Sequence, residues 1–334
     1  MPFQEGDFIE TVDGLIFDVK GLVHPPDKAI AFIRYIPDPN GDRERNGQKF
    51  RKIYDLSERN EFLRKNYPEY LVYDDVFDET LNEVPNCKLF FHYKPVKKTL
   101  EIQEDSYLRR EEEQTLEFIN IIKGLADISL NKIGVSGSIL VGLSSRSSDI
   151  DVIIYGSKNC RKAHDVLSEL LHEGKVLKTF NQSVLAARHM ERNKETWTSF
   201  DDYVLHELRK SFQGCFMERE FFVRYVKDFD EIKEEYGDIH YKKMGYAKIV
   251  GSVIDDSEAI FTPCTYLLDN VETINGKERS PIEEIVSFRG RFCEQAKMGE
   301  KVTAQGKIEQ VEKKGRIHYR LLLGNTPKDF MITN

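Results

Sequence analysis

The stretch GVSGSILVGLSSRSSDIDVIIYG, residues 134–156, places two aspartates at the start of an apolar run. In a β-strand successive side chains point to opposite faces, so Asp149 and Asp151 share one face and Ile150 takes the other. Carboxylates in this arrangement can converge on a hard cation such as Mg²⁺, which binds one or two carboxylates together with phosphate oxygens and water. Gly137 and Ser138 end the preceding apolar run, where a glycine permits close backbone approach and a serine hydroxyl can hold phosphate. The stretch predicts a phosphate-binding turn that faces a metal site.

A simpler interpretation of the same residues is structural. Asp149 would then cap a turn in the serine-rich loop, and Asp151 would lie at a strand edge, because an Asp-x-Asp pair alone is a weak signal. The combination favours the metal site: an apolar strand, Gly-Ser, ten residues, D-I-D-V opening a second apolar strand, and then an amphipathic helix at 160–174.

The sequence around this stretch predicts an α/β core over residues 101–240. Apolar residues recur at helical spacing in 105–129, with acidic residues in the early turns, and again in 160–174, where Gly174 supplies a stop. Residues 131–137 and 218–228 are expected to be strands, and 182–212 largely helical. The order of elements is that of a sheet with helices packed on it.

The flanking segments are richer in strand signals. Residues 1–100 predict a β-rich α+β module, with strands in 14–24, 29–38 and 49–56 and a short helix that ends near Pro68. Residues 241–334 predict a small β-barrel or sandwich, with strands in 245–255, 259–268, 301–311 and 316–324. The sequence EKKG, residues 312–315, is a good hairpin turn between the last two.

Residues 134–156 resemble the signature of the polymerase-beta-type nucleotidyltransferase superfamily, which has Gly-Ser, a gap of about ten residues, and acid–apolar–acid–apolar on a strand. The resemblance covers residues 105–230. It implies a palm that transfers a nucleoside monophosphate from a nucleoside triphosphate to an acceptor hydroxyl, with two Mg²⁺ (or Mn²⁺) ions and release of pyrophosphate. It further implies that Asp149 and Asp151 are catalytic metal ligands and that Gly137 and Ser138 bind the nucleotide.

The whole chain also looks like an archaeal family of predicted nucleotidyltransferases. The residues that carry this second resemblance are GLVHPPDKAIAFIRYIPDPNGDRERNG, residues 21–47, and DDSEAIFTPCTYLL, residues 255–268. This second resemblance extends the expected superfamily to the whole chain but implies little about its biochemistry.

The superfamily usually has a third carboxylate on a later strand, often two residues before an arginine. In EREFFVRYVKD, residues 218–228, alignment on Arg224 puts Phe222 at that place. Glu220 lies two residues earlier on the same face and could substitute, and Asp228 is the other candidate. Without a third acid to activate the acceptor hydroxyl, the chain would bind nucleotide and metal but catalyse poorly. A binding protein that keeps the fold is therefore the alternative to an enzyme.

Basic residues suggest further contacts. Arg146, in the loop before Asp149, could reach a triphosphate oxygen. Arg43, Arg45, Arg51 and Lys52 flank a polar hairpin loop and could contact a nucleic-acid backbone, although a charged hairpin tip is the commoner explanation. Residues 287–316 carry eight Lys or Arg against four Glu, which favours RNA or DNA as the acceptor over a protein or a small molecule. A solvated barrel surface would explain the same charges.

Composition excludes several other classes. The net charge of −8 argues against a protein that covers long nucleic acid by charge alone. No apolar run approaches the roughly 20 residues that cross a bilayer. The first ten residues show no signal region, and the five cysteines are scattered, so a cytoplasmic protein is expected. No Walker loop, Rossmann glycine pattern or G-x-S-x-G elbow is present, which argues against ATPases, dinucleotide enzymes and hydrolases.

Overall fold

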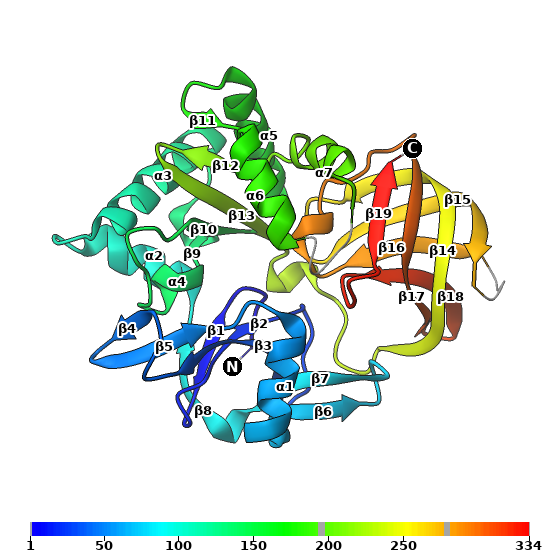
Figure 1. Ribbon diagram of the computed structural model, residues 1–334, viewed down its shortest axis with the longest axis horizontal. Helices are drawn as coiled ribbons and strands as arrows, with labels where there is room; N and C mark the ends of the chain where they lie inside the picture. Colours follow the sequence, from blue (N-terminus) through cyan, green and yellow to red (C-terminus); the bar gives the residue numbers. More distant parts are fainter. Residues whose placement is uncertain (1, 193–197, 277–280, 334) are drawn as a thin grey trace. The chain divides into compact units, whose positions relative to one another are not determined.

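Three β-sheets with helices form the protein in a computed structural model, which describes residues 2–192, 198–276 and 281–333 (Figure 1). The chain divides into two compact units. The first comprises Met1–Tyr73, Thr80–Thr179 and Phe212–Lys233, and the second comprises Asp74–Glu79, Phe180–Ser211 and Glu234–Asn334. The mixed α/β class predicted from the sequence is confirmed. Among the described residues, no helix combines the length and apolar character needed to cross a membrane.

The N-terminal sheet is an antiparallel half-barrel. Its strands follow the order β4-β5-β3-β2-β1-β8, and β7 pairs with β3 and β6. The bounds are β1 Phe8–Thr11, β2 Ile16–Val19, β3 Lys28–Pro37, β4 Arg43–Arg45, β5 Gln48–Lys52, β6 Leu71–Asp74, β7 Glu79–Pro85 and β8 Leu89–Tyr93. The predicted strands and the helix α1 (Leu56–Asn66) are confirmed, and α1 ends before Pro68 as expected.

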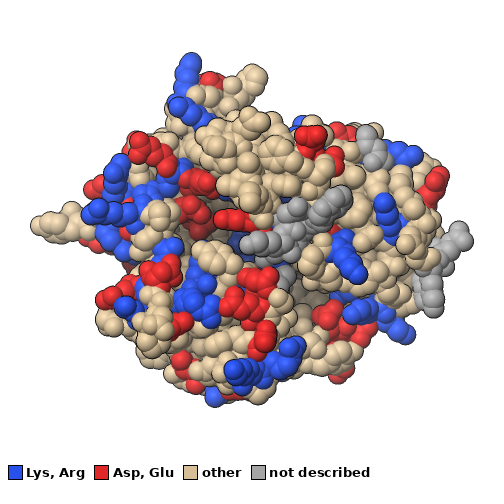
Figure 2. Space-filling model, viewed as in Figure 1, with Lys and Arg blue, Asp and Glu red and all other residues tan. Residues whose placement is uncertain are grey.

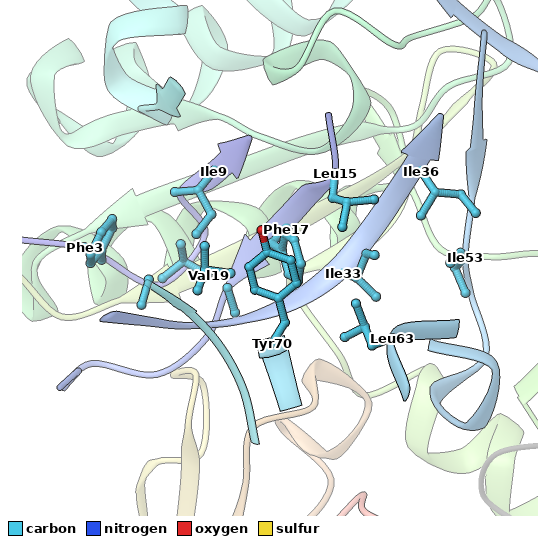
Figure 3. Close-up of a cluster of buried hydrophobic side chains, with 13 residues drawn as sticks. Phe3, Ile9, Leu15, Phe17, Val19, Ile33, Ile36, Ile53, Leu63 and Tyr70 are labelled. Atoms are coloured by element: carbon cyan, nitrogen blue, oxygen red, sulfur yellow. The ribbon is translucent and has the colours of Figure 1, made fainter. Parts of the chain in front are cut away.

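A cluster of thirteen buried side chains forms the core of this module (Figure 3). Alternation along β2 and β3 directs Phe17 and Ile33 into the cluster, where they meet Leu63 of α1. Phe17 lies against Tyr70, with ring centroids 5.4 Å apart, and the Tyr70 hydroxyl donates to Asp13 at 2.8 Å. The module therefore has a core of its own on the side that faces α1.

The central sheet contains the two strands on either side of the Gly-Ser turn and the serine-rich loop, β9 and β10. Its order is β11-β12-β13-β10-β9, and β10 and β13 run parallel while the other pairs are antiparallel. The bounds are β9 Ile133–Val135, β10 Ile150–Tyr155, β11 Leu177–Lys178, β12 Gln213–Phe216 and β13 Arg219–Val226, with helices α2 Pro95–Glu104, α3 Arg110–Ala126, α4 Gly137–Leu140 and α5 Ser157–Glu173. The helices and strands predicted for this region are confirmed, and α2, α4, β11 and β12 are additional.

The two faces of the central sheet have different covers. On one face, Phe221 and Tyr225 of β13 pack against Phe118 of α3 and His164 of α5. On the other, Ile153 packs with Val226 and Leu22, and Gly6 approaches so closely that a Cβ would collide with Ile153. The sheet therefore lies between a layer of helices and the N-terminal module, within the first unit.

The second unit contains the C-terminal strands, whose pairings close into a ring. β14 pairs with both β15 and β17, and β16 and β18 run parallel, so the order around the ring is β14-β15-β16-β18-β17 with β19 paired to β17. The bounds are β14 Ile239–Glu258, β15 Cys264–Asn275, β16 Ile282–Ser287, β17 Lys301–Lys313, β18 Arg316–Leu323 and β19 Phe330–Thr333, with helices α6 Gln182–Arg192 and α7 Phe200–Glu207.

Local sequence signals account for part of this unit. Lys314 and Gly315 both have positive φ between β17 and β18, which is the two-residue turn predicted from EKKG. The strand predicted over 259–268 begins later, at Cys264, because residues 259–263 form turns around Pro263. β16 was not predicted, since its two glutamates interrupt a short apolar run.

A buried histidine of the second unit predicts a pH effect on stability. Burial, together with the charges of Lys210 and Arg209, lowers the pKa of His206 to about 4. Its Nδ1 lies 3.1 Å from Gln295 Nε2, which also donates to the Met331 carbonyl at 2.7 Å, so Nδ1 acts as an acceptor and must be unprotonated. The unfolded chain, with a histidine pKa near 6.5, binds more protons between these values. The free energy of unfolding is therefore expected to fall as the pH drops from about 6.5 to about 4.

Urea unfolding at a series of pH values checks this expectation. His206→Gln keeps an acceptor without a titrating ring and should reduce the slope over this range, and the slope that remains includes His24, whose pKa burial also lowers to about 4. His240→Gln, which changes an exposed histidine of β14, is the matched control and should leave the wild-type slope. Equal slopes for the wild type and His206→Gln would contradict the assignment.

Candidate functional site

Asp149 and Asp151 lie at the start of β10, as the sequence predicts. Asp149 is exposed and immediately precedes the strand, whereas Asp151 is half-buried within it. The Ser136 N–H donates to the Asp151 carbonyl at 2.9 Å, which continues the β9–β10 ladder. Asp151 therefore faces the same side of the sheet as Ile153, toward the N-terminal module.

Gly137 allows the Gly-Ser turn to approach Asp151. Its φ is +62°, and a Cβ at this position would overlap Oδ2 of Asp151. Any other residue would be strained in its backbone and would displace the carboxylate. The sequence placed Gly137 and Ser138 at the end of a strand, but β9 ends at Val135 and the two residues begin the short helix α4, with Ser138 buried.

Two arginines hold the serine-rich loop between Ser138 and Asp149. Arg43 of β4 donates to Ser145 Oγ at 2.7 Å and to Ser148 Oγ at 3.3 Å. Arg219 of β13 donates to the Ser148 carbonyl and, through Nε, to Gln114 at 2.9 Å. Arg146, proposed from the sequence to reach a triphosphate, is exposed in the same loop. The position of Asp149 thus depends on contacts from β4 of the N-terminal sheet and from β13 of the central sheet.

The third carboxylate has no counterpart at the expected place. Phe222 pairs in register with Asp151, so a phenylalanine stands beside the aspartate. Glu220 is half-buried on β13, and the same register extended by one residue would place it beside Asp149. Asp228 lies beyond β13 and pairs with Lys132 at 2.7 Å. In the part of the chain that the structure describes, no three His, Cys, Asp or Glu side chains are grouped so that they could hold a metal ion.

Charges from the N-terminal sheet reach the two aspartates. Burial raises the pKa of the Asp151 carboxyl, although the positive charges of Lys52, Arg224 and Arg34 act in the opposite direction. Burial and repulsion from Arg34 lower the pKa of Lys52 to about 8, although Asp151 and Asp149 oppose this. Lys52 and Arg34 therefore belong to the electrostatic environment of the site.

A buried ion network joins the N-terminal module to the central sheet behind the site. Arg224 of β13 donates to Glu5 at 2.8 Å and lies 3.6 Å from Asp18. Lys20 contacts both acids, at 3.1 Å and 2.9 Å. Although burial acts against it, Lys20, Arg224 and Arg34 hold the pKa of Asp18 below its ordinary value. This network keeps four charged groups paired in a poorly solvated layer.

The sequence placed Lys52 only at a hairpin and gave Arg34, Glu5 and Asp18 no role. A usable signal exists for Lys52: alternation along β5 puts it on the same face as the buried Phe50. Arg34 lies within an apolar strand, where no local pattern identifies a partner.

Comparison with known proteins shows one whole-chain relationship. The chain is 32% identical over 333 residues to the uncharacterized protein MJ1086 of Methanocaldococcus jannaschii, which covers 97% of this chain and 96% of the relative. The whole-chain resemblance to an archaeal protein, predicted from the sequence, is confirmed. No protein-family model and no solved structure matches the chain.

The contact between Gly137 and Asp151 can be tested by adding one methyl group. Gly137→Ala should lower the free energy of unfolding by about 1 to 2 kcal/mol for the left-handed backbone and by about 1 to 3 kcal/mol more for the overlap with Asp151. Gly174→Ala is the matched control, because Gly174 has a φ of +67° and open space where a Cβ would stand. Denaturant unfolding of both variants measures the difference, and an equal loss would contradict the close approach.

Proposed function

The chain belongs to the family of MJ1086, and we propose that it is a metal-dependent nucleotidyltransferase of the polymerase-beta type. The proposal rests on one observation above all: Asp151 lies directly against the Gly137 backbone, and Asp149 immediately precedes the strand that carries Asp151. In this interpretation the central sheet with α3 and α5 is the palm.

The residues at the site fit a magnesium ion. The donor set is two carboxylates, which are the hard oxygen ligands that Mg²⁺ prefers, and Mg²⁺ commonly takes only one or two from the protein and the rest from phosphate and water. The missing Cβ of Gly137 leaves the Asp151 carboxylate beside the backbone of the turn. Asp149 and Asp151 would hold the metal, and Ser138 with the Gly137 backbone would hold the triphosphate.

The proposed reaction joins the acceptor oxygen to the α-phosphorus of the triphosphate. The bond from that phosphorus to the bridging oxygen breaks, pyrophosphate leaves with the bonding electron pair, and the proton of the acceptor hydroxyl passes to solvent water. Bound Mg²⁺ supplies charge neutralisation of the phosphate oxygens. The chain positions the two reactants, and the loop held by Arg43 and Arg219 keeps Asp149 in place.

A nucleic-acid end is the acceptor that we favour, on the basis of the basic residues in 287–316. Several of these already have acidic partners: Lys307 pairs with Glu79 and Glu309, Lys313 with Glu234, and Arg316 with Glu283. Figure 2 shows acidic and basic side chains interspersed on the face in view. Because several of these basic side chains are already paired, the label-transfer experiment below compares RNA, DNA and protein as acceptors.

A second candidate function follows from Phe222. With a phenylalanine where the superfamily has its third acid, the chain would bind nucleotide and metal without turnover. The two functions share Asp149 and Asp151 and differ in whether a nucleotide is transferred.

Label transfer separates the two functions. The protein is incubated with Mg²⁺ or Mn²⁺, each α-labelled triphosphate, and RNA, DNA or protein acceptors, and labelled product and pyrophosphate are measured. Asp149→Asn and Asp151→Asn should each lower transfer by about a thousandfold, since metal ligation contributes several kcal/mol to the transition state. Asp165→Asn, an exposed aspartate on α5, should not change it. Triphosphate binding without transfer to any acceptor would favour the binding function.

A further inference from the structure

The N-terminal half-barrel forms the layer opposite the two aspartates. Asp151 shares its face of the central sheet with Ile153 and, across the register, with Arg224. Arg224 binds Glu5 and Asp18, and Ile153 meets Gly6, so this face of the sheet looks onto the N-terminal module. Phe8 of β1 and Phe50 of β5 are buried in one cluster with Leu140 of α4, and Figure 1 shows β5 next to α4.

Lys52 lies on the face of β5 that packs against the residues following the Gly-Ser turn. It pairs in register with Tyr35 and shares a face of β5 with Phe50. Tyr35 and Phe50 are buried in a cluster with side chains that follow Ser138, namely Leu140, Val141 and Leu143. The Lys52 ammonium lies 4.8 Å from the centre of the Tyr54 ring, which orients it without neutralising it.

Arg34 is directed by a β-bulge. Along the β2–β3 pair, Ile16 is opposite Tyr35 but Phe17 is opposite Ile33, so Arg34 is an extra residue in β3. Bulges re-aim side chains and recur next to active sites. Burial and the positive charge of Arg34 lower the pKa of Lys52, and that charge opposes the burial that raises the pKa of Asp151, so Arg34 belongs to the same electrostatic environment as both groups.

These two cations differ from the arginines around them. Arg43 and Arg45 are engaged by the serine loop and by Glu10, and Arg224 is engaged by Glu5 and Asp18. Within the described residues, neither Lys52 nor Arg34 makes an ion pair. Two like charges in a partly desolvated layer repel each other, and a bound anion would relieve that cost.

We propose that Lys52 and Arg34 form a phosphate-binding subsite opposite Asp149 and Asp151, so that the half-barrel is part of the reaction site. The identity of the phosphate rests on the proposed function. Two aspartates at −2, two cations at +2 and two divalent ions at +4 give a site of about +4, which matches the roughly −4 of a triphosphate. A phosphorylated acceptor end would present the same oxyanion chemistry, and the experiment distinguishes the two sources.

Calorimetric titration tests the subsite without requiring turnover. The probes are inorganic tripolyphosphate with Mg²⁺, and one oligonucleotide with a 5′-phosphate or a 5′-hydroxyl. Lys52→Met and Arg34→Gln should each weaken the binding of the phosphate probe about tenfold, since each variant removes a charge-assisted hydrogen bond. Lys49→Met, an exposed lysine on the other face of β5, should stay within about twofold. Lys52→Arg keeps the charge and should restore most of the affinity.

The pattern of losses identifies the source of the phosphate. Weaker tripolyphosphate binding assigns the subsite to the donor triphosphate, and weaker binding of the 5′-phosphate oligonucleotide alone assigns it to the acceptor. Unchanged binding of every probe in folded variants, or no binding by the wild type, would overturn the subsite. If Lys52 and Arg34 control phosphate binding while the wild type transfers no label, the subsite stands and the enzymatic function fails.

Discussion

The pairing of Arg224 with Glu5 and Asp18 is the interaction on which the first unit depends. Arg224 lies on the face of the central sheet that the N-terminal module covers, and a guanidinium there is stable only if acids reach it. The acids come from residues more than 200 positions earlier in the chain. Their pairing fixes the half-barrel over the sheet, and with it the side of β5 that carries Lys52. The ion network and the candidate site therefore lie on the same face of the central sheet.

The two carboxylates of the candidate site are positioned in different ways. Asp151 is fixed by its strand and by the bare backbone of Gly137, whereas Asp149 is exposed and its loop is held by Arg43 and Arg219. Both carboxylates are therefore preorganised, one by its strand and the other by the hydrogen bonds of its loop. The register partner of Asp151 is Phe222, so an apolar ring stands where the proposed reaction would use a carboxylate to activate the acceptor hydroxyl.

Local patterns predicted the elements well where they were long or strongly periodic. The helices α3 and α5, the strands β10 and β13, and the hairpin turn at Lys314 and Gly315 follow from spacing and turn chemistry within a few residues. The elements that were missed have weak or short local patterns of their own, as β16 and α4 illustrate. β16 has a weak pattern of its own and is a strand because β15 and β18 lie on either side of it, and α4 is only four residues long.

The sequence by itself determined that Asp149 and Asp151 share a face and that a glycine stands before Ser138, because strand alternation and backbone freedom are local properties. Only the tertiary structure decided that Asp151 lies against Gly137, that Phe222 and not an acid stands beside it, and that the charges of Lys52 and Arg34 act on Asp151. Each of these depends on which strands are neighbours, and strand pairing joins residues far apart in the chain. A local sequence pattern does not encode strand pairing, because pairing is decided when both faces of the central sheet are buried at the same time.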